Sequence, residues 1–417
     1  MTAGALVLAF SSLAIDAAIT EPWLRRHDWF YTGNAEGASA VLQAIAGSMI
    51  TLAGLVFSLT LVALTLASSQ FGPRLLRSFM RDVRNQVVLG TFVATFLYSL
   101  LVLLAIRHGE ADRFVPHLSV TFGVVLAVAS LAVLIYFVHH VSTSIHADEL
   151  AAAVGRDLVQ AIDRLCPLGA PPASDRPGEL PVHFDREARC IPSAGDGYLQ
   201  IVDVGALVAL AARHGLVLRL ERAPGQYAIE GSAILSAWPA SAVSDEAADA
   251  LASAFVLGNQ RTPEQDVEYP IHQLVEIAVR ALSPGINDPF TALACVDHLS
   301  SGLSRLARRE MPALWHADES GRLRVVMRRL DFTQAVGAAF DQIREYGRTS
   351  AAVTIHLLEA IAAIAPFAVR DGDRDALRRQ ARMIERGARD ALPEANDRQR
   401  VEAALQAALS RLCLTRE

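Results

Sequence analysis

A line of small and hydroxyl-bearing residues runs along the apolar segment 38–70. Its members are spaced alternately by four and three residues, which keeps them on one side of an α-helix. These positions, which we call the seam, are Gly47, Thr51, Gly54, Ser58, Leu61, Thr65 and Ser68, with Ser69 and Gln70 at its end. Hydroxyl groups and open backbone can bond to a facing helix or solvate a passing ion, so the seam is the first candidate for function.

Two interpretations of the seam stay open. In the first, small residues let helix backbones approach closely, either within one chain or between copies, and hydroxyls bond across the contact. In the second, several copies turn the seam toward a common axis and form a water-lined conduit in which Leu61 is an apolar constriction. Packing is the simpler interpretation of the residues themselves, and the two are compatible because an oligomeric pore also needs packed helices.

A basic repeat follows the seam directly. Its arginines, spaced by three and four residues, are Arg74, Arg77, Arg81 and Arg84. Gly72 and Pro73 interrupt the helix before them, and apolar residues fall largely on the opposite side, which predicts an amphipathic helix at the membrane surface. Anchoring to anionic headgroups is the simpler role, and a positive ring at a pore mouth that favours anions is the alternative.

A second polar group lies in the C-terminal half of the chain. Ser283, Asn287 and Asp288 form a polar turn, and the proline directly after Asp288 predicts that a helix begins there. Upstream, an ion pair between Arg261 and Asp266 is the simplest use of those two residues. We interpret the five residues as structural. A ligand or cation site is the alternative, but the sequence places no base, nucleophile or metal-ligand set beside them.

Composition excludes several classes of function. The chain has 417 residues, of which 52% are hydrophobic and 20% charged, with a net charge of −6, so we expect no nucleic-acid partner. All 38 basic residues are arginine, which excludes lysine chemistry such as a Schiff base or a Walker loop. The four cysteines lie far apart, and no common hydrolase, zinc-protease or dinucleotide motif is present. We therefore expect no enzyme, no cofactor and no metal site.

Four apolar stretches in the first third of the chain can be set against the length of about 20 residues that a bilayer core requires; the first is slightly short and the second is longer than a perpendicular span requires. They predict a transmembrane domain over 1–141, with spans near 2–20, 38–70, 86–106 and 114–138. The loop with the basic repeat should be cytoplasmic by the positive-inside rule. Both termini are then cytoplasmic, and the protein is a multi-pass protein of the inner membrane.

The remainder of the chain is predicted to be a cytosolic α+β domain that is mostly helical, so the whole protein is mainly α. We expect a stalk helix and proline-rich linker over 142–196, a small β-containing module over 197–243 and a mainly helical part over 244–417. Helix N-caps are predicted at Asp203, Ser244, Asp288, Asp331 and Thr349.

Four strings of the sequence resemble a bacterial family known as domain of unknown function 2254, a family of inner-membrane proteins. They are 54–58 (GLVFS), 67–77 (ASSQFGPRLLR), 261–266 (RTPEQD) and 281–292 (ALSPGINDPFTA). The likeness extends over nearly the whole chain. It implies N-terminal spans followed by a long cytosolic domain, and it implies no settled activity.

The sequence as a whole favours a homo-oligomer in the lipid bilayer whose second span lines a pathway for an ion or small solute. In this hypothesis the cytosolic part serves assembly or gating. The alternative is a membrane-anchored scaffold or sensor whose cytosolic domain binds a partner or ligand without conduction.

Overall fold

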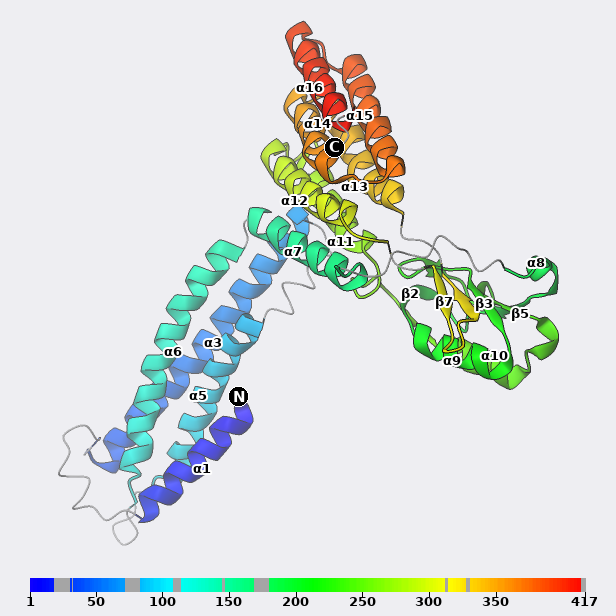
Figure 1. Ribbon diagram of the computed structural model, residues 1–417. Helices are drawn as coiled ribbons and strands as arrows, with labels where there is room; N and C mark the ends of the chain where they lie inside the picture. The colour runs from blue at the N-terminus through cyan, green and yellow to red at the C-terminus, as the bar shows by residue number, and fades with distance from the viewer. Residues whose placement is uncertain are drawn as a thin grey trace. The chain divides into compact units, whose positions relative to one another are not determined.

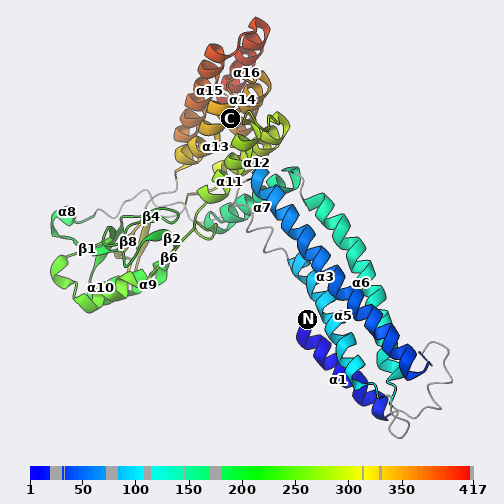
Figure 2. The same cartoon turned by 180° about the vertical axis from the view of Figure 1, so that it is seen from behind.

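The computed structural model describes residues 1–18, 31, 33–71, 83–107, 114–144, 147–168, 180–311, 314–327 and 331–413. The chain forms two compact units, Met1–Glu149 and Leu150–Glu417 (Figure 1 and Figure 2).

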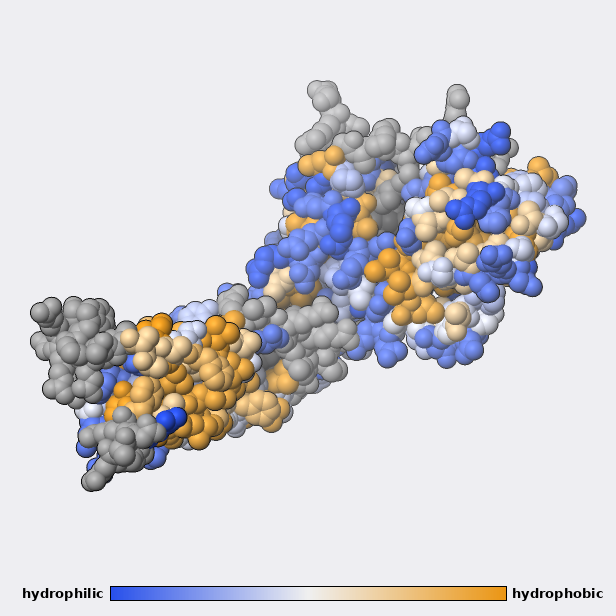
Figure 3. Space-filling view, turned by 90° about the horizontal axis from the view of Figure 1, so that it is seen from below, coloured by the Kyte–Doolittle hydropathy of each residue, from blue (hydrophilic) through white to orange (hydrophobic). Residues whose placement is uncertain are grey.

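The first unit is a bundle of long helices with an apolar surface (Figure 3). In the described part of the chain these helices are α1 (Thr2–Ala18), α3 (Ala35–Phe71), α5 (Val83–Ala105) and α6 (His117–Ser144). By length and composition, α3, α5 and α6 could each cross a membrane. Helix α1 has 17 residues, or about 26 Å at 1.5 Å per residue, against about 30 Å for a bilayer core. The predicted span near 2–20 is therefore a shorter apolar helix.

Helix α5 packs against the three other helices of this bundle. Its residues Phe92, Tyr98 and Val102 are fully buried, and they meet α3 through large side chains such as Leu42 and Val56. The core of the first unit thus consists mainly of aliphatic and aromatic contacts between helices.

One carboxylate inside this bundle joins α1 to the first turn of α6. Asp16 is buried, and its Oδ1 accepts a hydrogen bond from the Leu118 N–H at 2.9 Å. Its Oδ2 accepts from the Ser119 N–H at 2.8 Å and the Ser119 hydroxyl at 2.6 Å. The Tyr98 hydroxyl completes the group by donating to the Ser119 carbonyl at 3.0 Å. Asp16 therefore caps a helix other than its own, which satisfies backbone donors that lipid could not.

Replacing Asp16 by alanine should lower the free energy of unfolding of the bundle by about 2 kcal/mol, because buried donors of α6 would lose a charged acceptor. Unfolding of the full chain in mixed detergent, followed by circular dichroism, measures the change. Ser11→Ala is the control, since Ser11 is exposed and its hydroxyl bonds to the Val7 carbonyl of its own helix. Equal effects of the two substitutions would refute the capping role.

The second unit combines two small β-sheets with a helical bundle. The five-stranded sheet has the order β1-β5-β3-β8-β7, and the three-stranded sheet has the order β4-β2-β6. All strand pairs are antiparallel except β3 with β8. The strands are β1 (Arg189–Pro192), β2 (Gly197–Val202), β3 (Val217–Leu220), β4 (Tyr227–Ala228), β5 (Ala233–Trp238), β6 (Phe255–Gly258), β7 (Trp315–Ala317) and β8 (Leu323–Val326).

The helices of the second unit fall into two groups (Figure 1). Helices α8 (Phe184–Glu187), α9 (Val204–His214) and α10 (Asp245–Ala252) accompany the strands. The bundle contains α11 (Glu268–Ala281), α12 (Pro289–Ala307), α13 (Phe332–Gly347), α14 (Ala351–Ile364), α15 (Asp371–Ala391) and α16 (Ala395–Cys413). Helix α7 (Ala147–Leu165) precedes both groups, and short 3₁₀ helices lie at Ala240–Ala242 and Ala365–Phe367.

The sheets draw strands from outside the β-containing module predicted over 197–243. Strand β1 comes from the predicted linker, and β6, β7 and β8 come from the part predicted to be mainly helical. Strand β8 pairs with β3 through Leu218 and Val325, both fully buried. The β7–β8 hairpin thus interrupts the helical sequence and completes a sheet that began about 100 residues earlier.

The predicted N-caps at Asp203, Ser244, Asp288 and Asp331 each accept a backbone N–H bond at the start of a helix. The prediction of Thr349 as a cap was wrong by one residue, since Ser350 accepts the bond from the Val353 N–H. Both residues can cap a helix, and only the backbone conformation decides between them.

Candidate functional site

Helix α3 has one covered and one uncovered face. Leu42, Met49, Ala53 and Val56 are buried against the neighbouring helices of the first unit. The seam lies on the other face, where all its members from Gly47 to Thr65 are exposed. The interpretation in which a single chain buries the seam against its own helices is therefore wrong for this part of α3.

The glycines of the seam confirm how open this face is. A Cβ atom built at Gly47 or Gly54 would meet no other atom within 4 Å. Leu61, the predicted constriction, is 54% exposed. The seam, apart from Leu61, is therefore a strip of low side-chain bulk within an uncovered face that also exposes large apolar side chains such as Ile50 and Phe57. A second helix or solvent can approach the backbone along this strip.

Two hydroxyl groups of this face bond within α3 itself. Thr51 donates to the Gly47 carbonyl at 2.8 Å, and Thr65 donates to the Leu61 carbonyl at 2.9 Å. Such bonds to the preceding turn satisfy the hydroxyl donors, while the oxygen lone pairs stay open as acceptors. Ser48 and Thr60, which lie on α3 outside the seam, bond in the same way, so the open glycines rather than the hydroxyl bonding distinguish the seam.

The C-terminal end of the predicted site is described only in part. Ser68, Ser69 and Gln70 lie in the last turn of α3, and Arg84 lies in the first turn of α5, but their side chains fall outside the described residues. Arg74, Arg77 and Arg81 fall outside them altogether. The predicted basic ring therefore stays a prediction.

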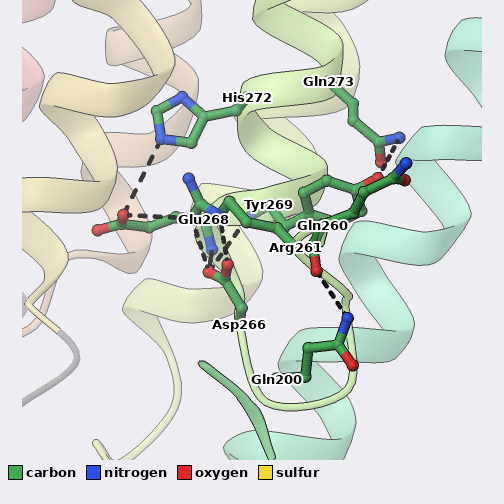
Figure 4. A network of polar contacts seen from close by, with 8 residues as sticks. All are labelled: Gln200, Gln260, Arg261, Asp266, Glu268, Tyr269, His272 and Gln273. Atoms are coloured by element: carbon green, nitrogen blue, oxygen red, sulfur yellow. Dashed lines mark hydrogen bonds and ion pairs between the residues drawn. The ribbon is translucent and has the colours of Figure 1, made fainter. Parts of the chain in front are cut away.

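Arg261 and Asp266 form a two-bonded ion pair at the start of α11 (Figure 4). The Arg261 Nε donates to Asp266 Oδ2 at 2.7 Å, and its Nη2 donates to Asp266 Oδ1 at 3.0 Å. Asp266 is only 5% exposed, and its Oδ1 also accepts from the N–H groups of Glu268 and Tyr269. One carboxylate thus fixes the preceding loop and caps α11.

Two further contacts hold this loop. Arg164 of α7 donates to the carbonyls of Pro263 and Glu264 at 2.5 and 3.0 Å. Gly225, in the turn before β4, approaches so closely that a Cβ there would collide with the Asp266 carboxylate, and its φ is +88°. The loop 261–266 is thereby the place where α7, α11 and the turn before β4 meet, and Asp266 links the last two.

Glu268 lies beside this pair, in the first turn of α11 (Figure 4). Its Oε2 is 3.7 Å from Arg261 Nη2 and 4.0 Å from His272 Nε2. Partial burial, reinforced by the neighbouring charge of Asp266, raises the pKa of the Glu268 carboxyl despite the opposing effect of Arg261. Folding therefore favours the protonated form of the Glu268 carboxyl.

The turn at Ser283, Asn287 and Asp288 lies at the opposite end of α11. The helix has 14 residues, so about 21 Å separates this turn from the Arg261–Asp266 pair. The Ser283 hydroxyl donates to the Arg280 carbonyl, Asn287 adopts a φ of +51°, and Asp288 caps α12 through the Phe290 and Thr291 N–H groups. The five residues thus form two local structures rather than one site.

Asp16 is the functional candidate that the sequence interpretation missed. A charged residue inside an apolar helix is a signal for a buried partner. Its partner Ser119, however, lies 103 positions away in the sequence, which no local pattern can reveal.

Among the described residues, no group of three or more metal-ligating side chains is present.

Comparisons with known proteins agree with the membrane character of the chain. A family model described as "Predicted membrane protein (DUF2254)" matches residues 1–363. The uncharacterised proteins Rv1290c of Mycobacterium tuberculosis and Mb1321c of Mycobacterium bovis are each 36% identical to the chain over 374 residues. The matches cover 88% of this chain and 71% of each relative. No solved structure matches the chain.

Asp266→Asn should destabilise the second unit by about 3 kcal/mol, because it removes the buried carboxylate that two Arg261 nitrogens bind and leaves only the more distant Glu268. Chemical unfolding of the full chain, followed by tryptophan fluorescence, measures the effect. In Asp375→Asn, which removes an exposed pair with Arg378, the loss should stay below about 1 kcal/mol. If the two losses are equal, Asp266 is not the joint described above.

Glu268→Gln should change how stability depends on pH. A raised pKa means that the folded chain binds the Glu268 proton more tightly than the unfolded chain does, so the wild type loses stability as pH rises through the folded pKa. The Gln variant should lack this loss and gain stability relative to the wild type as pH rises above 4.5, the ordinary pKa of a glutamate carboxyl. Melting temperatures measured as a function of pH test it, and a wild-type profile that falls no more than that of the variant would contradict it.

Proposed function

Since the chain belongs to the DUF2254 family of predicted membrane proteins, we propose that copies of it associate in the bilayer through the uncovered face of α3. In the assembly, the seam lines a pathway for an ion or small solute. The second unit lies in the cytosol and serves assembly or gating, and the role is not enzymatic. The observation that carries this proposal is the exposure of every seam position from Gly47 to Thr65.

Packing in lipid supports association at this face. Helices in a membrane attract one another through close van der Waals contact and hydrogen bonds, and small residues allow the closest approach. The open glycines Gly47 and Gly54 offer such an approach. The covered face of α3 is already used by its own chain, so a second copy is the natural occupant of the uncovered one.

The polarity of the seam supports a pathway. With their donors bonded to the helix, Thr51 and Thr65 present hydroxyl oxygens outward, and oxygen acceptors can replace part of a cation's hydration shell. Leu61, between Ser58 and Thr65, would form an apolar ring where the column of water is interrupted. Such a ring could gate the pathway by dewetting.

The positive-inside rule supports the orientation. Segment 71–85 has four arginines and one aspartate, which favours the cytoplasmic side for the end of α3 and the start of α5. The second unit follows α6 and would lie on the same side. The N-terminus would also lie there if α1 crosses the inner membrane.

Ser58→Cys should cross-link between copies in native membranes, whereas Val128→Cys on α6, which is 65% exposed, should cross-link far less. The first unit has no native cysteine, and replacing the exposed Cys190 and Cys413 by serine removes the reactive background. Equal yields at positions 58 and 128 would reject α3 as the interface.

Currents across planar bilayers then separate a pathway from a packing contact. The purified full chain should give unitary currents, and Leu61→Ser should raise them because it removes the apolar ring. If Ser58→Cys cross-links while the bilayers stay silent under voltage, tension and osmotic steps, the face is a packing contact and the scaffold hypothesis replaces the pathway.

A further inference from the structure

Three arginines on α15 form an exposed strip with no acidic partner. Arg379, Arg382 and Arg386 are spaced by three and four residues, so they lie on one side of the helix. None of them makes an ion pair with another residue that the structure describes. We call these three residues the arginine strip.

The other arginines around this helix are bound within the chain. Arg378 donates to Asp375 at 2.8 Å and to the Leu412 carbonyl at 3.0 Å. Arg370 bonds to Asp373, and Arg389 bonds to Glu385 at 2.7 Å. The arginine strip is therefore distinct in directing its guanidinium groups toward solvent, where each can bind a carboxylate through two hydrogen bonds.

Helix α10 carries a matching acidic face. Glu246 and Asp249 are exposed and separated by three residues, so they lie on one side of the helix. The opposite side, with Ala247, Ala248 and Leu251, is buried in the β-containing part. Neither acid makes an ion pair among the described residues, in contrast to Asp245, which bonds to Arg189 at 2.6 Å.

These two faces belong to separately packed parts of the second unit. Helix α15 packs with α13, α14 and α16, whereas α10 packs with α9 and β1. Each charged face thus points away from the layer that holds its helix, and both are available to another molecule.

We propose that the arginine strip of one copy binds the acidic face of α10 on a second copy. The spacing of Arg382 and Arg386 is close to that of Glu246 and Asp249, so two ion pairs can form between parallel or antiparallel helices. A contact between two different surfaces gives a ring if the rotation between neighbouring copies closes, and an open filament if it does not. The proposal rests on the association of copies proposed for α3, but it uses a surface of its own.

Charge reversal tests this contact in the full chain. All copies carry Cys190→Ser, and each is labelled at the exposed Cys413 with either a donor or an acceptor dye. The labelled copies are reconstituted into phosphatidylcholine vesicles. Energy transfer between the dyes is then measured as a function of protein density in the membrane. Arg382→Glu with Arg386→Glu should raise the density needed for half association on the order of tenfold at low salt. Glu246→Arg with Asp249→Arg should have the same effect, and the fourfold variant should restore association. Arg213→Glu, on an exposed position of α9, is the control and should leave it unchanged.

Three results would overturn the proposal. The first is association that either double reversal leaves unchanged, and the second is a fourfold variant that fails to restore association. The third is an effect of the arginine reversals only in vesicles that contain phosphatidylglycerol, which would assign the strip to lipid headgroups. The Ser58→Cys cross-link, introduced together with the same charge reversals, reports separately whether copies associate through α3. Failure of the contact between α15 and α10 is therefore distinguishable from failure of the α3 interface.

Discussion

The one-sided packing of α3 is the constraint on which the first unit depends. Large side chains on one face, such as Leu42, Met49 and Val56, are buried against the neighbouring helices. Lipid tails are as apolar as the side chains of a helix, so the hydrophobic effect adds little to the association of helices in a membrane. Close packing and hydrogen bonds must therefore hold the bundle together. The opposite face combines the small residues of the seam with exposed apolar side chains such as Ile50 and Phe57, and no described helix of the same chain covers it. In the proposed assembly, another copy approaches this face along the seam.

A single buried carboxylate has a comparable role in the second unit. Asp266 binds Arg261, caps α11 and lies against Gly225, while Arg164 holds the same loop through its carbonyls. The string 261–266 is one of those that carry the likeness to the family. Its arginine and aspartate have a role in folding that needs no ligand, and the same is true of Asp288 in the string 281–292. Likeness in these strings is therefore weak support for a catalytic site.

Local features of this fold could be predicted from sequence, and remote pairings could not. The long apolar helices and the caps at Asp203, Ser244, Asp288 and Asp331 follow from composition and from short-range hydrogen bonding. The parallel pairing of β3 with β8 depends on a meeting of residues about 100 positions apart, for which the sequence offers only two short alternating stretches. The exposure of the seam could not be predicted either, because the spacing of its residues is the same whether they face another helix of the same chain or the surroundings of the chain.

Weak contacts suffice in such an assembly when two of them act together. Exposed ion pairs are individually worth about 1 kcal/mol or less, so the arginine strip could not hold two separate soluble molecules. Copies confined to a bilayer and held through α3 meet at a high effective concentration, at which a weak second contact forms readily. Its charges would then set the order and orientation of the second units, while α3 supplies most of the binding. A salt-sensitive contact far from the seam could in this way change how tightly the α3 faces are held together without touching the seam itself.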